Sequence, residues 1–176
     1  MKLQFKEQKF QLQAVNAIVD CFEGQPLKAN RFTLERSKEL IRKAKQVAIG
    51  SVQAAVFEEE VLAEIGYRNS PLQIMDSQVL KNIQSVQRQN GLNESASIER
   101  PKGVKLGYNL TIEMETGTGK TYTYIRTMYE LHKHYGWSKY IVIVPSIAIR
   151  EGVYKSFQVT QDHFQESYGH KINPFI

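Results

Sequence analysis

The stretch METGTGKTYTY, residues 114–124, restricts the local backbone more than any other part of this 176-residue chain. Gly117 and Gly119 stand where a backbone must bend and approach an anion without an obstructing Cβ. Lys120 supplies a cation and Thr121 a hydroxyl, the groups with which a phosphate-binding loop holds nucleotide phosphates and Mg²⁺. The pattern predicts a nucleotide site at the start of a helix.

Met114 occupies the position of the first glycine in the standard pattern G-x-x-x-x-G-K-[ST]. That glycine eases the turn after a strand, whereas the later residues surround the phosphates, so its absence is compatible with binding. The alternative interpretation is a glycine turn that carries a surface lysine. The flanks favour the nucleotide site, because a β-rich run at 108–114 precedes the loop and a helical pattern follows it, ending at Gly136.

The C-terminal part of the chain has the pattern of an α/β domain. The continuous apolar run at 140–145 is typical of a parallel strand covered on both faces, and the following SIAIREGVYKSFQ predicts a short helix. We therefore expect strand, loop, helix, strand and helix over 108–157, the start of a doubly wound parallel sheet. Two strands are too few for such a sheet, so we expect only part of this domain within the 176 residues.

The N-terminal part is predicted to be helical. Residues 8–22 form an amphipathic helix. Further helices are expected over 33–49, over 52–65 with Gly66 as C-cap, and over 76–88 with Asp76 as N-cap. The predicted apolar stripe of the first helix consists of Phe10, Ala14, Ala17, Ile18, Cys21 and Phe22.

Charge and cysteine content give only weak information on the binding partners and the cellular compartment of the protein. The net charge of +5 and the pI of about 9.2 favour a polyanionic partner slightly. The basic residues of 28–45 alternate with Glu35 and Glu39, which is typical of a solvated helix face. The single cysteine, Cys21, is expected in the core of a protein from a reducing compartment. No apolar run is long enough for a membrane span or a signal core, so we expect a cytoplasmic protein.

The histidines give no metal-binding pattern in the sequence. His132 and His134 are two residues apart on a predicted helix and therefore point to different faces, and no nearby cysteine or acid completes a ligand set. His163 and His170 are isolated. We expect all four to be surface or packing residues.

The segments EMETGTGKTYTYIRTMYEL and YIVIVPSIAIREGV closely resemble the N-terminal part of the Res subunit of type III restriction enzymes, which translocates on DNA and cleaves it. These subunits belong to the superfamily 2 helicase-like ATPases, whose first motif has no obligatory leading glycine. The resemblance implies a RecA-like fold that binds ATP and Mg²⁺. It assigns ATP binding to the first motif, catalytic roles to Lys120 and Thr121, and Mg²⁺ ligation to Thr121. The motif consists of Thr116, Gly117, Thr118, Gly119, Lys120 and Thr121.

The same resemblance assigns further contacts and partners. Pro145 and Ser146, with Val144, match a motif that touches the sugar–phosphate backbone of DNA. Phe10 and Gln11 match an aromatic–glutamine pair that contacts adenine, with Gln13 as the alternative glutamine. The implied partners are double-stranded DNA and the methyltransferase (Mod) subunit.

The resemblance covers 1–22 and about 106–157, under half of the chain. It divides the chain into an adenine-contacting helix at 1–26, a helical insertion and linker at 27–105, and the start of a truncated RecA-like ATPase domain at 106–176. An acidic Walker B pair, a second ATPase lobe and a nuclease are not found, so we expect the isolated chain to bind nucleotide weakly without hydrolysing it. Two alternatives stay open: another P-loop NTPase such as a small-molecule kinase, and a non-catalytic remnant that binds DNA or the methyltransferase.

Overall fold

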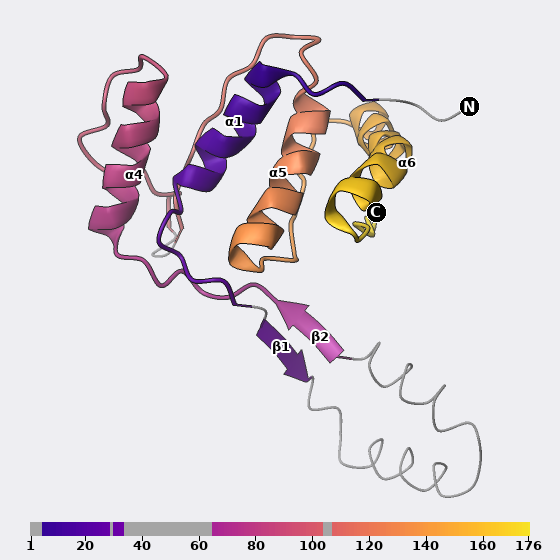
Figure 1. Ribbon diagram of the computed structural model, residues 1–176, viewed down its shortest axis with the longest axis horizontal. Coiled ribbons are helices and arrows are strands. Elements are labelled where there is room, and N and C mark those ends of the chain that lie inside the picture. The colour runs from indigo at the N-terminus through magenta and orange to yellow at the C-terminus, as the bar shows by residue number, and fades with distance from the viewer. Residues whose placement is uncertain (1–4, 29, 34–64, 104–106) are drawn as a thin grey trace, which may run out of the picture.

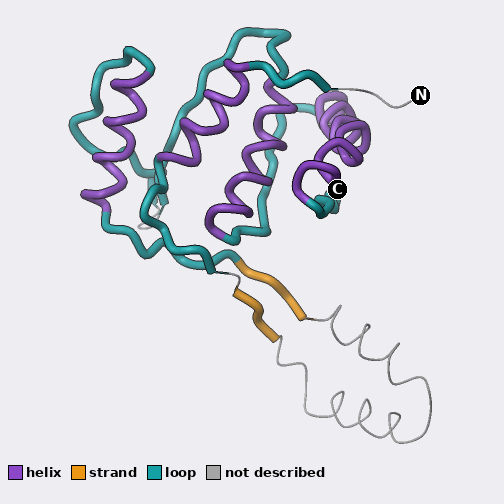
Figure 2. The backbone as a smooth tube through the Cα atoms, in the orientation of Figure 1, coloured by secondary structure: helices purple, strands orange, loops and turns teal. Residues whose placement is uncertain are grey.

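The computed structural model describes residues 5–28, 30–33, 65–103 and 107–176. Within these ranges the chain forms helices that stand side by side, and a short pair of strands projects from one end of the helical layer (Figures 1 and 2). In chain order the elements are α1 (Lys9–Asp20), β1 (Asn30–Thr33), β2 (Ile65–Arg68), α4 (Asp76–Gln89), α5 (Lys120–Tyr135) and α6 (Ile147–Tyr168).

The predicted parallel α/β sheet is wrong for the described residues. Their one sheet is the antiparallel pair β1–β2, in which Asn30 lies opposite Arg68. The runs at 108–114 and 140–145 form no strand, and Ile141 and Ile143 are each 90% exposed. An apolar run states only a preference for burial, whereas a strand also requires a neighbour that pairs with its backbone N–H and C=O groups. Neither run has such a neighbour among the described residues. Apart from the β1–β2 pair, the regular structure of the described part is therefore helical.

The helix predicted at 8–22 is confirmed as α1. Its predicted apolar stripe is only partly right, since Cys21 is buried and Ala14, Ala17, Ile18 and Phe22 are partly buried. The buried positions of α1 are Val15 and Val19, which are four residues apart and pack on α5. Phe10, assigned to the stripe, is 47% exposed. The phenol of Tyr135 on α5 donates a hydrogen bond of 2.9 Å to the Val19 carbonyl oxygen. Because α1 contacts α5 on one side and α4 on another, its neighbours decide which apolar residues are covered.

Aromatic rings hold α5 and α6 together. Tyr129 and Phe164 are almost fully buried, and their ring centres are 4.8 Å apart in a stacked arrangement. The predicted helix after Pro145 is confirmed, but α6 is 22 residues long rather than short. It begins after Ser146, whose Oγ accepts a hydrogen bond from the Ile149 N–H, and it ends at Gly169, which has a φ of +78°.

Polar side chains fasten α4 to the turn that follows α1. The buried Asn82 amide donates hydrogen bonds to the carbonyl oxygens of Cys21 and Glu23, at 3.3 and 2.9 Å. The helix predicted at 76–88 is thus confirmed, although Met75 rather than Asp76 is its N-cap. These bonds satisfy the Cys21 carbonyl group at the C-cap of α1 and the Glu23 carbonyl group in the turn that follows.

The two helices predicted within 33–65 fall largely outside the described residues. Their described ends differ from the prediction. Thr33 belongs to β1, and Ile65 begins β2. Gly66 pairs with Phe32 inside the β1–β2 ladder and is therefore not a helix C-cap.

Ionisation of Cys21 is expected to destabilise the fold at high pH. Burial, assisted by the nearby Asp20 carboxylate, raises the pKa of the Cys21 thiol from 9.0 to about 11. The folded state therefore retains this proton more strongly than the unfolded state, so the contribution is complete below pH 9 and is lost as the pH rises through about 11. Guanidinium denaturation across this range should show a larger loss of unfolding free energy for the wild type than for Cys21→Ala. Equal losses of unfolding free energy in the two proteins would mean that Cys21 does not contribute to the pH dependence of stability.

Candidate functional site

The glycine loop forms a tight turn directly before α5. Gly117 and Gly119 have φ values of +82° and +88°, in the left-handed region that glycine adopts without strain. The Glu115 carbonyl oxygen accepts hydrogen bonds from the N–H of Thr118 at 3.4 Å and from its Oγ1 at 2.7 Å. Gly119 is then the N-cap of α5. The sequence prediction of a loop followed immediately by a helix is confirmed.

The start of α5 is chemically suited to an anion. The N-cap residue Gly119 has no side chain with which to cap the helix, so the first-turn N–H groups receive no hydrogen bond from their own N-cap side chain. A Cβ built on Gly117 would have nothing within 4 Å, which leaves open space beside the loop. Lys120 is exposed and Thr121 is half-buried at the first positions of the helix. A phosphate chain placed there meets backbone N–H groups, an ammonium group and a hydroxyl.

Gln11 connects α1 to the loop across 107 residues of sequence. Its Nε2 donates a hydrogen bond of 2.8 Å to the Thr118 carbonyl oxygen. The same Nε2 lies 2.5 Å from the position of an ideal Cβ on Gly119, so the Gln11 amide occupies space that only a glycine leaves free. The structure thus brings Gln11 of the predicted adenine-contacting pair to the glycine loop. Nothing in the spacing of the sequence signals the Gln11–Thr118 contact.

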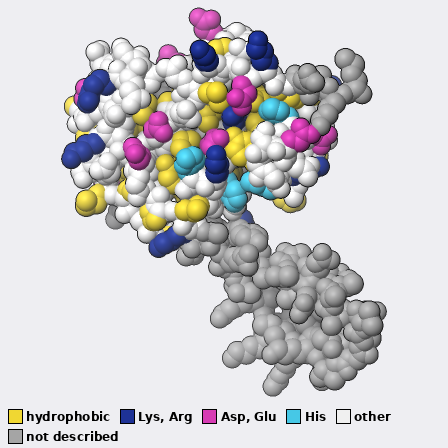
Figure 3. Space-filling model, in the orientation of Figure 1, with side chains coloured by type: hydrophobic (Ala, Val, Ile, Leu, Met, Phe, Trp, Pro, Cys, Tyr) yellow, Lys and Arg dark blue, Asp and Glu magenta, His cyan; other side chains and the backbone are white. Residues whose placement is uncertain are grey.

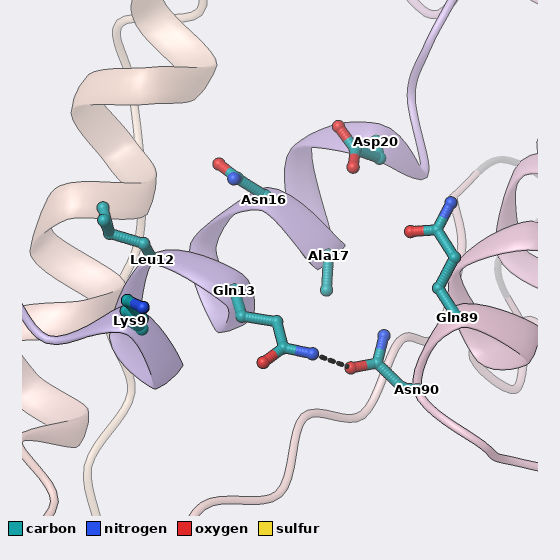
Figure 4. Close-up of a pocket in the computed structure, with 8 residues that line it drawn as sticks. All are labelled: Lys9, Leu12, Gln13, Asn16, Ala17, Asp20, Gln89 and Asn90. Atoms are coloured by element: carbon teal, nitrogen blue, oxygen red, sulfur yellow. Dashed lines mark hydrogen bonds between the residues drawn. The ribbon is translucent and has the colours of Figure 1, made fainter.

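Gln13, the alternative glutamine, faces a different part of the molecule. Its Nε2 donates a hydrogen bond of 3.0 Å to Asn90 Oδ1 across a shallow hollow of about 390 Å³ between α1 and α4 (Figure 4). Neither Gln11 nor any residue of 116–121 lines this hollow. Its polar lining consists of Lys9, Gln13, Asn16, Asp20, Gln89 and Asn90.

The sequence analysis did not predict a group of polar and aromatic contacts that lies next to the glycine loop. Glu7, which precedes α1, forms an ion pair with Arg126 of α5 at 2.7 Å, and Phe5 stacks on Tyr122 with ring centres 5.8 Å apart. The phenol of Tyr122 also makes a hydrogen bond of 2.9 Å to His163 Nε2 on α6. Burial and the Arg126 charge lower the pKa of His163. These contacts join the segment before α1 to the first turns of α5 and to α6.

The residues predicted to touch DNA lie on the surface. Pro145 and Ser146 are both exposed. Ser146 also caps α6, which accounts for a serine at this position without any ligand. Their contact with DNA therefore stays a prediction.

The described residues contain neither a metal-binding cluster of three or more ligand side chains nor a membrane-spanning helix. No group of three or more histidine, cysteine, aspartate or glutamate side chains is arranged to hold a metal ion in the described part of the chain. Among the helices of that same part, none is long and apolar enough to cross a membrane.

Comparison with known proteins identifies the family. The sequence model of the family described as type III restriction enzyme, res subunit matches residues 4–174. The Res subunit of the EcoP15I type III restriction-modification enzyme of Escherichia coli is 34% identical over 110 residues, and that of the EcoPI enzyme of Escherichia phage P1 is 34% identical over 115. Each alignment covers 61% of this chain and 11% of the relative.

A third relative is the Res subunit of the StyLTI type III restriction-modification enzyme of Salmonella typhimurium. It is 47% identical over 62 residues, which cover 34% of this chain and 6% of that protein. The matched part of the chain thus spans only 6 to 11% of the length of these three relatives. Because the family match extends from residue 4 to residue 174, this chain belongs to the type III restriction enzyme Res subunit family.

Proposed function

We propose that the loop at 116–121 binds ATP with Mg²⁺. The observation that carries this proposal is the pair of left-handed glycines, Gly117 and Gly119, directly before the first turn of a helix whose N-cap is Gly119. Backbone N–H groups of the loop and of the first turn of α5 would hold the phosphates. Lys120 would neutralise the terminal phosphates, and the Thr121 hydroxyl would ligate Mg²⁺. Bound Mg²⁺ supplies charge neutralisation at the phosphate oxygens.

Phe10 and Gln11 are proposed to hold the adenine. The Phe10 ring is 47% exposed, which leaves a face on which a base can stack. Gln11 already contacts the loop through its Nε2. A glutamine amide matches the N6 and N7 edge of adenine, with the oxygen accepting and the nitrogen donating. In this arrangement Gln11 would contact both the base and the loop that holds the phosphates.

The proposed role of the whole protein follows from the family. We propose that the intact protein is the ATP-dependent subunit that translocates on double-stranded DNA and cleaves it together with a methyltransferase (Mod) subunit. Pro145 and Ser146 are the residues proposed to contact the DNA backbone. We propose that such a protein acts in the cytoplasm, where it meets its DNA substrate. The 176-residue chain covers a small fraction of its relatives, so we expect it to bind nucleotide weakly and not to hydrolyse it.

Replacing Lys120 by alanine tests the nucleotide site. We expect Lys120→Ala to lower the affinity of the 176-residue chain for Mg·ATP about 10-fold to 100-fold, because one charge-assisted contact contributes about 1.5–3 kcal/mol. The measurement is titration of a fluorescent ATP analogue with displacement by unlabelled ATP. Lys133→Ala is the matched control, since Lys133 is exposed on the last turns of the same helix. Its affinity should equal that of the wild type.

Two results would contradict the proposal. One is an affinity for Mg·ATP that falls equally in Lys120→Ala and Lys133→Ala, which would indicate nonspecific attraction to positive charge. The other is the absence of saturable binding in a wild-type chain that circular dichroism shows to be folded.

A further inference from the structure

Two histidines that are distant in the sequence meet in the structure. His132 lies on α5, and His170 follows the end of α6. Their ring centres are 4.8 Å apart, with 65° between the ring planes. Histidine side chains gather on the face formed by α5 and α6 (Figure 3). The two histidines are far apart in the sequence, and only the packing of α6 on α5 brings their rings together.

The hydrogen bonds of this pair fix the tautomer of each neutral ring. His132 Nδ1 lies 3.0 Å from the Trp137 carbonyl oxygen, and His170 Nδ1 lies 2.9 Å from the Tyr168 carbonyl oxygen. A carbonyl oxygen only accepts, so both Nδ1 atoms must carry the proton. Each Nε2 of a neutral ring then presents its lone pair. A histidine that donates its other N–H to a carbonyl oxygen is the usual arrangement at metal sites.

The spacing of the two rings suits one metal ion. A Zn–N bond of about 2.0–2.1 Å puts each ring centre about 3.2 Å from the metal, so two imidazoles on a tetrahedral ion stand about 5 Å apart. The observed separation of 4.8 Å matches this value. At this ring separation one ion can be shared when both Nε2 atoms are turned toward it.

The pair is also accessible. Both rings are only partly buried, and both line an open hollow of about 1,210 Å³ that Tyr129, Ile141, Val142 and Lys171 border as well. The hydrogen bonds of these two rings run through Nδ1, and none to either Nε2 is found among the described residues. An ion can thus reach the lone pairs from solvent.

We propose that His132 and His170 bind one divalent transition-metal ion of the class that prefers imidazole, with Zn²⁺ as its representative. The described residues offer no third histidine, cysteine or carboxylate to the pair, so water completes the coordination. The ion would link the segment after α6 to α5 and would stabilise the packing of Tyr129 on Tyr168, whose ring centres are 4.9 Å apart. This site is independent of the glycine loop, which is suited to a phosphate-bound Mg²⁺.

Calorimetric titration of the tag-free 176-residue chain with ZnCl₂ tests the site. We expect one equivalent of Zn²⁺ to bind to the wild type, and His132→Gln and His170→Gln each to weaken binding at least about 10-fold. His134→Gln is the matched control, because His134 is two residues further along the same helix and is half exposed. It should bind Zn²⁺ as the wild type does. Excess Mg²⁺ should not compete, since Mg²⁺ prefers oxygen ligands.

Two further measurements cover the case in which a variant loses its fold. Zn²⁺ should raise the melting temperature of the wild type and of His134→Gln but not of either pair variant, since an ion that binds only the folded state stabilises it. With Cu²⁺, electron paramagnetic resonance should report two nitrogen ligands in the wild type. The proposal is overturned if the wild type shows no stoichiometric Zn²⁺ binding, if His134→Gln weakens binding as much as His132→Gln does, or if folded pair variants bind like the wild type.

Discussion

Phe164→Ala is expected to lower the free energy of unfolding by about 3–5 kcal/mol, because it removes a buried aromatic side chain and leaves a cavity. Phe164 is 1% exposed and stacks on Tyr129 and Tyr122, with ring centres 4.8 and 5.1 Å away. These rings belong to the hydrophobic cluster between α5 and α6. A small domain has about 5–15 kcal/mol of stability in total, so this variant should lose a large fraction of the stability of the fold.

Guanidinium denaturation followed by far-ultraviolet circular dichroism measures this effect. Phe175→Ala is the control, since Phe175 is 96% exposed and its removal should change stability by less than about 0.5 kcal/mol. A loss below about 1 kcal/mol for Phe164→Ala would mean that the α5–α6 contact does not form part of the cooperative fold.

Gly119→Ala is expected to damage the loop and its connection to α1 together. A side chain at a φ of +88° costs about 1–3 kcal/mol. The new Cβ would also lie 2.5 Å from Gln11 Nε2, so the amide must move away and its hydrogen bond to Thr118 is lost. That bond contributes about 0.5–1.5 kcal/mol. We therefore expect a loss of about 2–4 kcal/mol in unfolding free energy, together with weaker binding of Mg·ATP.

A double-mutant cycle with Gln11→Ala separates the two causes. Removing the Gln11 amide abolishes the clash, so the double variant should be more stable than the sum of the single losses predicts. Gly91→Ala is the control for backbone strain alone, because Gly91 has a φ of +68° and a Cβ there would have nothing within 4 Å. Additive losses for Gly119→Ala and Gln11→Ala, or equal losses for Gly119→Ala and Gly91→Ala, would show that Gln11 does not contact the loop in solution.

Local signals predicted the local structure well. The glycine loop, the helix that follows it and the end of that helix at Gly136 all lie where the pattern puts them. The reason is that a left-handed turn and a helix terminus depend on the residues of one short segment. The resemblance stated from the loop and its flanks is confirmed by the family match over residues 4–174.

Pairing between segments was predicted badly. The runs at 108–114 and 140–145 have the composition of strands, yet neither has a partner strand within the described residues. The apolar stripe of α1 was only partly right for a related reason: α5 buries Val15 and Val19, which the stripe omitted, whereas Phe10 is left exposed. Composition indicates which residues favour burial, but the elements that pack against a segment determine which of those residues become buried.

The sequence by itself determined the position of the glycine loop, the positions of the helices in the described part and the family, since each depends on residues close together in the chain. Only the tertiary structure decided that Gln11 contacts Thr118 across 107 residues, and that His132 stands beside His170. Both contacts arise from helix packing, α1 on α5 and α5 on α6, in which side chains distant in sequence become neighbours. No periodicity along the chain encodes such distances, so these contacts could be found only from the packed structure.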